Sequence, residues 1–222
     1  MKKIKPIAIY LPQYYETEYN NRWWGKGFTD WVAVKKAVPC FDGHRQPKVP
    51  LHKNYYDLLD KNTLLYQQEL MKQYGIYGLC FYHYYFKDGV KVLEKPAENL
   101  LKWKEIAIPF CFNWPSEKWI RTWSNFYGNV WGEKFDSDAD RTGDGVLLEQ
   151  SFGFKPEWKA HFDYLLPFFK DERYIKIDGK PIFIFHNTEQ ISCLKEMTKY
   201  WIDLAEENGL SGIYFIGSNV SG

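Results

Sequence analysis

The stretch "IAIPFCFNW" (Ile106–Trp114) is continuously apolar up to Asn113. A strand buried on both faces has such an unbroken apolar run, whereas a strand with one wet face alternates apolar and polar residues. The same character recurs in "PIAIYL" (Pro6–Leu11) and "IYGLCFYHYY" (Ile76–Tyr85). Because strands buried on both faces are typical of parallel sheets covered by helices, these runs predict the α/β fold class.

Helical patterns separate these strands along the chain. "NTLLYQQELMKQYG" (Asn62–Gly75) places apolar residues roughly on one face and ends at a glycine, and "VKVLEKPAENLLKWKEI" (Val90–Ile106) predicts a helix interrupted by proline. We expect long loops before Asp57 and before Phe154. In the remaining sequence, the pattern predicts a helix over Pro156–Asp171 and an Asp-Gly turn followed by a fourth strand within Arg173–His186. It then predicts a helix over Ile191–Gly209 and a fifth strand over Leu210–Asn219.

Composition narrows the classes of ligand. A chain of 222 residues with 45% hydrophobic residues can bury a substantial core, and it is expected to form a single domain over residues 1–222. The net charge of +1, without a block of lysine or arginine, gives no electrostatic indication of nucleic acid or an anionic membrane. The 10 Trp and 17 Tyr favour surfaces that are half apolar and half wet, as sugars require.

Cofactors, redox state and location are predicted mainly from missing patterns. The four cysteines lie far apart with no CxxC pair, which predicts reduced thiols. Neither a zinc constellation nor a phosphate-binding loop is evident, and "DSDADRTGD" (Asp136–Asp144) lacks the glycine and glutamate that an EF-hand needs, so we expect no cofactor. With no signal peptide and no apolar run that could span a membrane, we expect a cytoplasmic protein.

Candidate site residues follow from the rule that ligands bind beyond the carboxyl ends of parallel strands. Glu117 is the candidate catalytic residue: it would accept hydrogen bonds from a sugar diol or act as an acid, and the alternative is a rim carboxylate paired with Lys118 or Arg121. For His83 the alternative is a core histidine. For the loop around Trp24 the alternative is a small satellite core. If this loop binds the ligand instead, its Asp30 is expected to bind hydroxyls. The predicted substrate-binding residues are Tyr10, Gln13, Trp24, His83, Tyr84, Asn113, Trp114, Trp119 and His186.

Ordered motifs resemble a known family. "IAIYLPQYY", "WWGKGFTDW", "HRQPKVPL", "YGIYGLCFYHYYF", "PFCFNWPSEKW", "LLEQSF" and "LLPFFKDERYIKIDGKPIFIF" together resemble the WbsX-type glycosyltransferase-like family of bacterial polysaccharide-synthesis clusters. That family is similar to the endo-alpha-mannosidase glycoside hydrolases, so the resemblance implies a (β/α)8 TIM-barrel-like fold.

Two departures from the family pattern matter. The third-strand motif is usually closer to "NWANENW", so Asn113, Trp114, Glu117 and Trp119 match while the residues between them differ. The late "NEWxEG" segment, whose glutamates are catalytic in the related mannosidases, is absent. A closed barrel usually needs about 250 residues, so we expect an incomplete barrel of about five β/α units.

The resemblance implies a carbohydrate-active protein of bacterial polysaccharide biosynthesis, for O-antigen or capsule. It would act on a glycan or an activated sugar by glycosyl transfer or glycoside hydrolysis. The alternative is a non-catalytic glycan-binding or scaffold module, a remnant of such an enzyme. An open parallel edge at the fifth strand predicts self-association.

Overall fold

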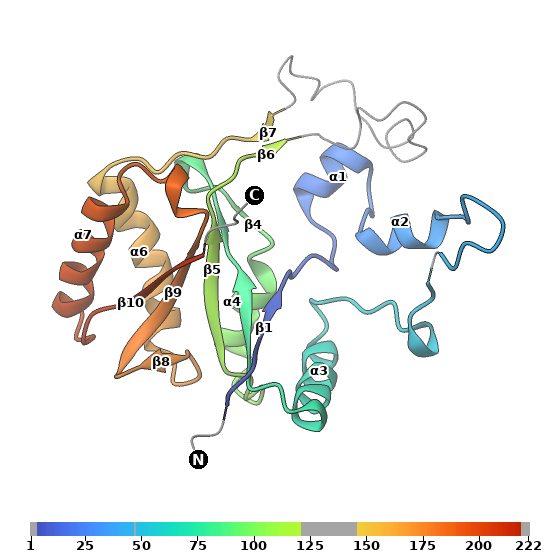
Figure 1. The fold of residues 1–222 in the computed structure, drawn as a ribbon, viewed down its shortest axis with the longest axis horizontal. Helices are drawn as coiled ribbons and strands as arrows, with labels where there is room; N and C mark the ends of the chain where they lie inside the picture. Colours follow the sequence, from blue (N-terminus) through green and yellow to red (C-terminus); the bar gives the residue numbers. More distant parts are fainter. Residues whose placement is uncertain (1–3, 47, 121–145, 219–222) are drawn as a thin grey trace.

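The computed structural model of the protein describes residues 4–46, 48–120 and 146–218. Its main sheet contains five parallel strands in the order β1-β2-β5-β9-β10, which is also their order along the chain (Figure 1). A doubly wound sheet reverses its strand order, whereas a (β/α)8 barrel does not. The strands are β1 (Ile7–Tyr10), β2 (Gly78–Tyr82), β5 (Phe110–Pro115), β9 (Lys180–His186) and β10 (Tyr214–Ser218).

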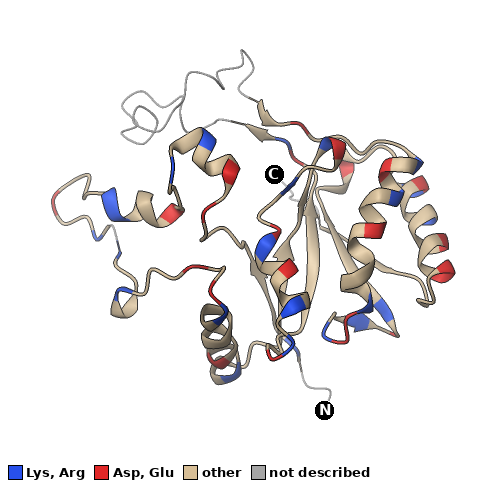
Figure 2. Cartoon of the chain, turned by 180° about the vertical axis from the view of Figure 1, so that it is seen from behind, with Lys and Arg blue, Asp and Glu red and all other residues tan. Residues whose placement is uncertain are grey.

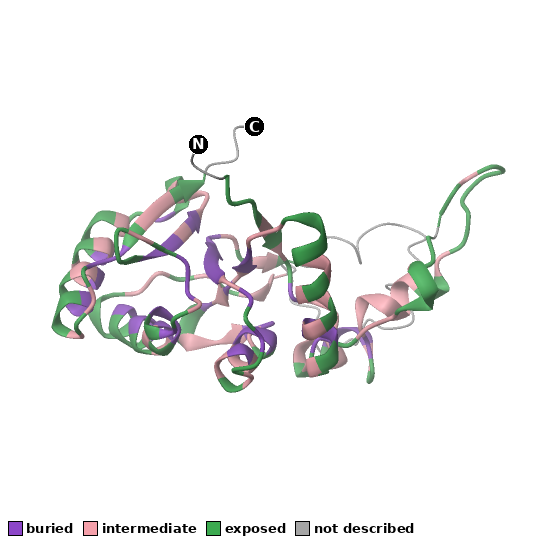
Figure 3. Cartoon of the chain, turned by 90° about the horizontal axis from the view of Figure 1, so that it is seen from below, coloured by how far each residue is buried: buried purple, intermediate pink, exposed green. Residues whose placement is uncertain are grey.

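This topology confirms the α/β class and the incomplete barrel. Among the described residues, β1 and β10 each pair with the main sheet on one side only, so the sheet stays open between them. The main connecting helices all cover the same face of the sheet, and their outer surfaces are exposed (Figures 1 and 3). They are α3 (Lys61–Tyr74), α4 (Lys95–Lys102), α6 (Lys155–Lys170) and α7 (Leu194–Glu207).

Shorter elements lie in the connections. The segment predicted as a loop before Asp57 contains α1 (Glu18–Trp24) and α2 (Asp30–Lys36), and the side chain of Thr17 caps α1 by accepting from the Asn20 N–H. The others are η1 (Leu51–Lys53), β3 (Tyr84–Tyr85), η2 (Lys87–Gly89), β4 (Lys91–Val92), β6 (Trp119–Ile120), β7 (Val146–Leu148), β8 (Lys176–Ile177) and η4 (Thr188–Gln190).

Two predicted boundaries were wrong. The run Ile76–Tyr85 is divided at His83 into β2 and β3, because β3 leaves the main sheet to pair with β4. The helix predicted over Val90–Ile106 is only α4, and Pro96 lies in its first turn. Proline is tolerated there since the first N–H groups of a helix need no partner, so it begins this helix instead of interrupting it.

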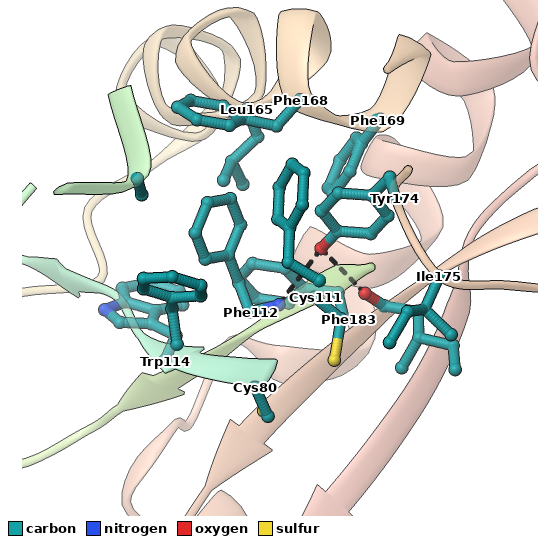
Figure 4. Packing of buried hydrophobic residues seen from close by; sticks show 14 of the residues in the cluster. Cys80, Cys111, Phe112, Trp114, Leu165, Phe168, Phe169, Tyr174, Ile175 and Phe183 are labelled. Carbon is teal, nitrogen blue, oxygen red and sulfur yellow. Dashed lines mark hydrogen bonds between the residues drawn. The ribbon is translucent and has the colours of Figure 1, made fainter. Parts of the chain in front are cut away.

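The core lies between the sheet and the helices and is dominated by aromatic rings (Figure 4). Phe112 of β5 packs edge to face on Phe168 of α6, with ring centroids 5.0 Å apart, and Phe183 of β9 packs on Trp201 of α7 at 5.3 Å. Charged residues lie mainly on the helices and loops, while the central strands carry few (Figure 2). Burial of these rings therefore attaches the helix layer to the sheet.

Tyr174 joins the two central strands inside this core. Its hydroxyl accepts a hydrogen bond from the Phe112 N–H at 3.2 Å and donates one to the Ile182 carbonyl at 2.8 Å (Figure 4). The side chain is 2% exposed, so water cannot replace it. A buried N–H needs a partner, and the hydroxyl supplies one at the residue where the pairing of β5 with β9 begins.

The opposite face of the sheet carries exposed apolar side chains at its edges. Ile7 and Ile9 of β1 are 38% and 69% exposed, and Tyr214 of β10 is 41% exposed. The next residues along each strand, Tyr10 and Phe215, pack toward the helices, so side-chain alternation places the exposed residues on the other face. Self-association through these edges stays a prediction.

The structure agrees with the sequence predictions for the cysteines and for the Asp-Gly turn. All four cysteines are free, and Cys80 lies beside Cys111 on neighbouring strands. The predicted Asp-Gly turn joins β8 to β9, with positive φ at both Asp178 and Gly179. Within the described ranges, no helix combines the length and apolar character that crossing a bilayer requires.

Replacing Tyr174 with phenylalanine removes the bridging hydroxyl and keeps the ring. The Phe112 N–H then stays buried without an acceptor, so we expect the free energy of unfolding to fall by about 1–3 kcal/mol. Urea denaturation of the wild type and the variant measures this. Tyr66→Phe, on a ring that is 48% exposed, is the matched control and should change stability by less than about 0.5 kcal/mol. Equal effects of the two substitutions would contradict the bridging role.

Candidate functional site

A cleft of about 510 Å³ lies at the carboxyl ends of β1, β2 and β5. Gln13 follows β1, Tyr84 follows β2, and Trp119 follows β5, so three successive connections contribute to one cavity. This is the end of a parallel sheet where ligands bind. The lining residues are Leu11, Gln13, Asn20, Trp23, Trp24, Phe28, Asp30, Tyr84, Leu93, Lys118, Trp119, Ile120 and Leu147.

One wall of the cleft is built by α1 and α2. Trp23, Trp24 and Phe28 form a small second core, and Trp119 packs against it with its ring centroid 6.2 Å from that of Trp23. The satellite core that the sequence left open as an alternative therefore exists. Since Trp24 and Trp119 also line the cleft, the same rings hold the wall in place and offer indole surface to a ligand.

Glu117 lies next to the carboxyl end of β9. Its Oε1 accepts a hydrogen bond from Asn187 Nδ2 at 3.3 Å and lies 4.0 Å from His186 Nε2. Its side chain is 43% exposed, so one carboxylate oxygen is oriented while the group stays open to solvent. Burial raises the pKa of Tyr84, and the charges of Tyr82 and Glu117 add to this effect.

Asn187 is a site residue that the sequence did not single out. It has a left-handed backbone with φ 58°, which asparagine tolerates better than most residues. Its N–H donates to the Ser218 carbonyl of β10, and its carbonyl accepts from Ser116 Oγ at 3.1 Å. These bonds join the carboxyl ends of β5, β9 and β10, and they aim the Asn187 amide at Glu117. An asparagine directly after an apolar strand was the available signal.

Asn113 carries a buried polar atom without a partner. Asn113 is 4% exposed, and its Oδ1 is the one side-chain nitrogen or oxygen among the described residues that is buried without a hydrogen bond. Its neighbours across the sheet are Tyr82 and Ile184, on the face opposite the helices. An orphaned acceptor of this kind costs about 1–3 kcal/mol, and functional sites are where such costs are found.

Three predicted residues point away from the cleft into the helix layer. The Tyr10 hydroxyl donates to Gln67 of α3 at 2.8 Å, and the Trp114 indole N–H donates to the Tyr85 carbonyl at 3.0 Å. His83 is 4% exposed and packs against Phe112. The structure therefore brings Gln13, Trp24, Tyr84 and Trp119 together at the cleft, with Glu117, Asn113 and His186 nearby at the sheet end.

His83 belongs to a buried histidine pair instead. Its Nε2 lies 2.7 Å from Nε2 of His161 in α6, so one ring donates and the other accepts. Burial lowers the pKa of His83 to about 3, with the charge of Lys91 adding to the effect. Burial also holds the pKa of His161 well below its usual range. Both rings are therefore neutral at physiological pH, and they join β2 to α6.

The described residues contain no group of three His, Cys, Asp or Glu side chains placed to hold a metal ion. The segment Asp136–Asp144, considered above as a calcium loop, and Arg121, the alternative partner of Glu117, lie outside the described residues. That the protein works without a cofactor stays a prediction.

A model of one protein family covers almost the whole chain. Residues 6–221 match the family described as glycosyltransferase WbsX. The uncharacterized protein WxcX of Xanthomonas campestris pv. campestris, from strain B100 and from strain ATCC 33913, is 29% identical over 208 residues, which is 94% of this chain and 27% of WxcX. The chain thus spans about a quarter of the length of the curated relatives it matches.

Solved structures give a distant match. The GH99 endo-alpha-mannosidase from Bacteroides thetaiotaomicron is 14% identical, with a TM-score of 0.47 over 96% of this chain and 54% of the mannosidase. Its complex with bis-tris propane has a TM-score of 0.46 at the same identity, over 96% of this chain and 51% of the mannosidase.

The histidine pair predicts sensitivity to acid. A histidine that is neutral when folded and protonated when unfolded stabilises the fold fully above pH 6.5, and this contribution is lost as the pH falls toward the folded pKa. We expect the free energy of unfolding to decrease below pH 6.5 by up to about 1.4 kcal/mol per pH unit for each of His83 and His161. Urea denaturation at a series of pH values between 7.5 and about 4.5 measures the slope.

Substitution separates this pair from the other titrating groups. His161→Gln, with His83→Gln as the second variant if it folds poorly, should lower stability at pH 7.5 and flatten the dependence on pH. His44→Gln, at a half-buried histidine outside this pair, should leave the slope unchanged. A slope that is the same in wild type and both pair variants would disprove the assignment.

Proposed function

Because the chain belongs to the glycosyltransferase WbsX family, we propose that it is a carbohydrate-active protein of bacterial polysaccharide biosynthesis, for O-antigen or capsule. Its substrate is a glycan or an activated sugar, and its reaction is glycosyl transfer or glycoside hydrolysis. The family match supports activity on carbohydrate.

The observation that carries the proposal is the tryptophan-walled cleft at the carboxyl end of the sheet. Trp24 and Trp119 provide flat apolar surface, and Gln13 and Asp30 provide hydrogen-bonding groups within the same 510 Å³. A pyranose ring has the complementary character, with apolar C–H faces and a polar rim of hydroxyls. The volume and mixed lining of the cleft also match those of sites that bind small molecules.

Glu117 is the proposed catalytic group. In glycosidic chemistry a carboxylic acid protonates the leaving oxygen, or a carboxylate assists the nucleophile, while an oxocarbenium-like charge develops on the sugar. The Asn187 amide donates to one oxygen of Glu117, and His186 Nε2 lies 4.0 Å from the same oxygen. We propose that Asn113, whose Oδ1 is buried and unpaired, accepts a hydrogen bond from the bound sugar.

Replacing Trp119 with alanine removes an indole wall, and we expect it to weaken glycan binding about tenfold or more, which corresponds to about 1.4 kcal/mol or more. Binding to an array of bacterial polysaccharide fragments, followed by calorimetric titration of the fragment bound best, measures the effect. Phe41→Ala, on an exposed ring in the loop after α2, is the control and should leave binding unchanged.

Glu117→Gln separates catalysis from binding alone. If Glu117 takes part in proton transfer, the variant should keep its affinity for the glycan and lose turnover by about 100-fold or more. Turnover is followed by mass spectrometry of the products. A wild type that binds glycan without turnover would favour the non-catalytic module, and a wild type that binds no glycan would refute the proposed function.

A further inference from the structure

Asp30 is the acidic side chain that lines the cleft. It lies at the first position of α2 and is half-buried, in the same lining as Trp24, Phe28 and Trp119. The basic residue in the described lining is Lys118, which is exposed. The more buried of these two charged side chains is therefore the negative one, although the whole chain is almost neutral.

The carboxylate of Asp30 forms no ion pair with another residue that the structure describes. Across the described part of the chain, no lysine, arginine or histidine forms an ion pair with Asp30, although eight other pairs of Lys or Arg with Asp or Glu occur there. Burial raises the pKa of the Asp30 carboxyl, and only its own backbone N–H opposes this. Apart from this N–H, no donor to the carboxylate occurs among the described residues, so a ligand in the aromatic cleft can supply the others.

The backbone holds Asp30 in a defined position. The indole N–H of the next residue, Trp31, donates to the Tyr56 carbonyl at 2.8 Å, and its ring stacks on Tyr14 at 4.1 Å. Before it, the turn between α1 and α2 is closed by the Gly27 N–H, which donates to Asn21 Oδ1 at 2.8 Å. Asp30 is therefore presented to the cleft by a supported turn, as a binding site requires.

The chemistry selects one class of ligand. An ionised carboxylate is an acceptor with two oxygens, so its natural partners are pairs of donors. An anionic ligand would be repelled, while two adjacent hydroxyls of a neutral sugar ring can each donate one hydrogen bond. The surrounding indoles would at the same time cover the apolar faces of that ring.

We infer that Asp30 is a specificity-determining residue of the cleft, and that it accepts hydrogen bonds from two adjacent hydroxyls of a neutral pyranose stacked among the tryptophans. This inference rests on the proposed function and adds to it the substrate class: a neutral sugar with a free vicinal diol. Sugars whose diol is removed or replaced by a carboxylate or phosphate at that position are rejected.

The experiment compares Asp30→Asn with wild type on methyl glycosides of neutral hexoses and on their monodeoxy derivatives. We expect Asp30→Asn to weaken binding of the best glycoside about tenfold or more, because a charged acceptor is lost. Removing one of the two recognised hydroxyls should weaken wild-type binding by a similar factor and leave the variant nearly unaffected. Such non-additivity identifies a direct contact.

Further variants exclude a merely structural role. Asp30→Glu restores the charge one methylene farther out and should recover part of the affinity. Wild-type affinity should fall as the carboxyl is protonated at acidic pH, and this dependence should be absent in Asp30→Asn. Asp203→Asn, on an exposed part of α7, is the matched control and should bind like wild type.

The outcomes separate the two proposals. If wild type binds glycosides and Asp30→Asn binds them equally well, or loses the same factor for every deoxy derivative, the inference about Asp30 is overturned while the proposed function stands. If wild type binds no glycoside in the series and no fragment on the array, both are overturned. Preference for uronic acids over neutral sugars would also overturn the inference.

Discussion

The requirement that the central strand satisfies all its backbone hydrogen bonds decides how the sheet is assembled. Every residue of β5 is buried, so no N–H or carbonyl on it can rely on bulk water. Its first residue, Phe110, accepts from Ile175 and donates to the Arg173 carbonyl, and the Tyr174 hydroxyl then serves the Phe112 N–H. From Phe112 onward β9 itself pairs with the strand. This succession sets the position of β9 relative to β5.

The site inherits its geometry from that pairing. Pro115 of β5 lies beside His186 of β9, so the residues that follow the two strands meet. There Ser116 Oγ donates a hydrogen bond to the Asn187 carbonyl. Glu117 then has an amide donor and an imidazole within reach. The Glu117 carboxylate is therefore oriented by the register of β5 and β9, in which hydrogen bonds join residues that are tens of positions apart in the sequence. The motif around Glu117 does not orient it by itself.

The aromatic residues serve two separate regions. One set fills the space between sheet and helices, where the buried His83 and His161 rings add a polar contact that must stay neutral. The other set, around Trp23 and Trp24, attaches α1 and α2 to the strands after β5 and forms the cleft wall. Because Trp119 contacts this second set, the wall and the end of β5 are mechanically joined. Asp30 reaches the cleft through this arrangement.

The sequence by itself determined the class of fold, the number of parallel strands and the end of the sheet where the cleft lies, because apolar periodicity and glycine signals are local. It also identified Gln13, Trp24, Tyr84 and Trp119, which do meet. Only the tertiary structure decided which face each side chain occupies. Successive residues of a strand point to opposite sides, so Asn113 reaches the open face while Trp114 enters the core. The wall built by α1 and α2, the His83 pairing and the role of Asn187 depend on contacts between distant segments, and no local pattern encodes those contacts.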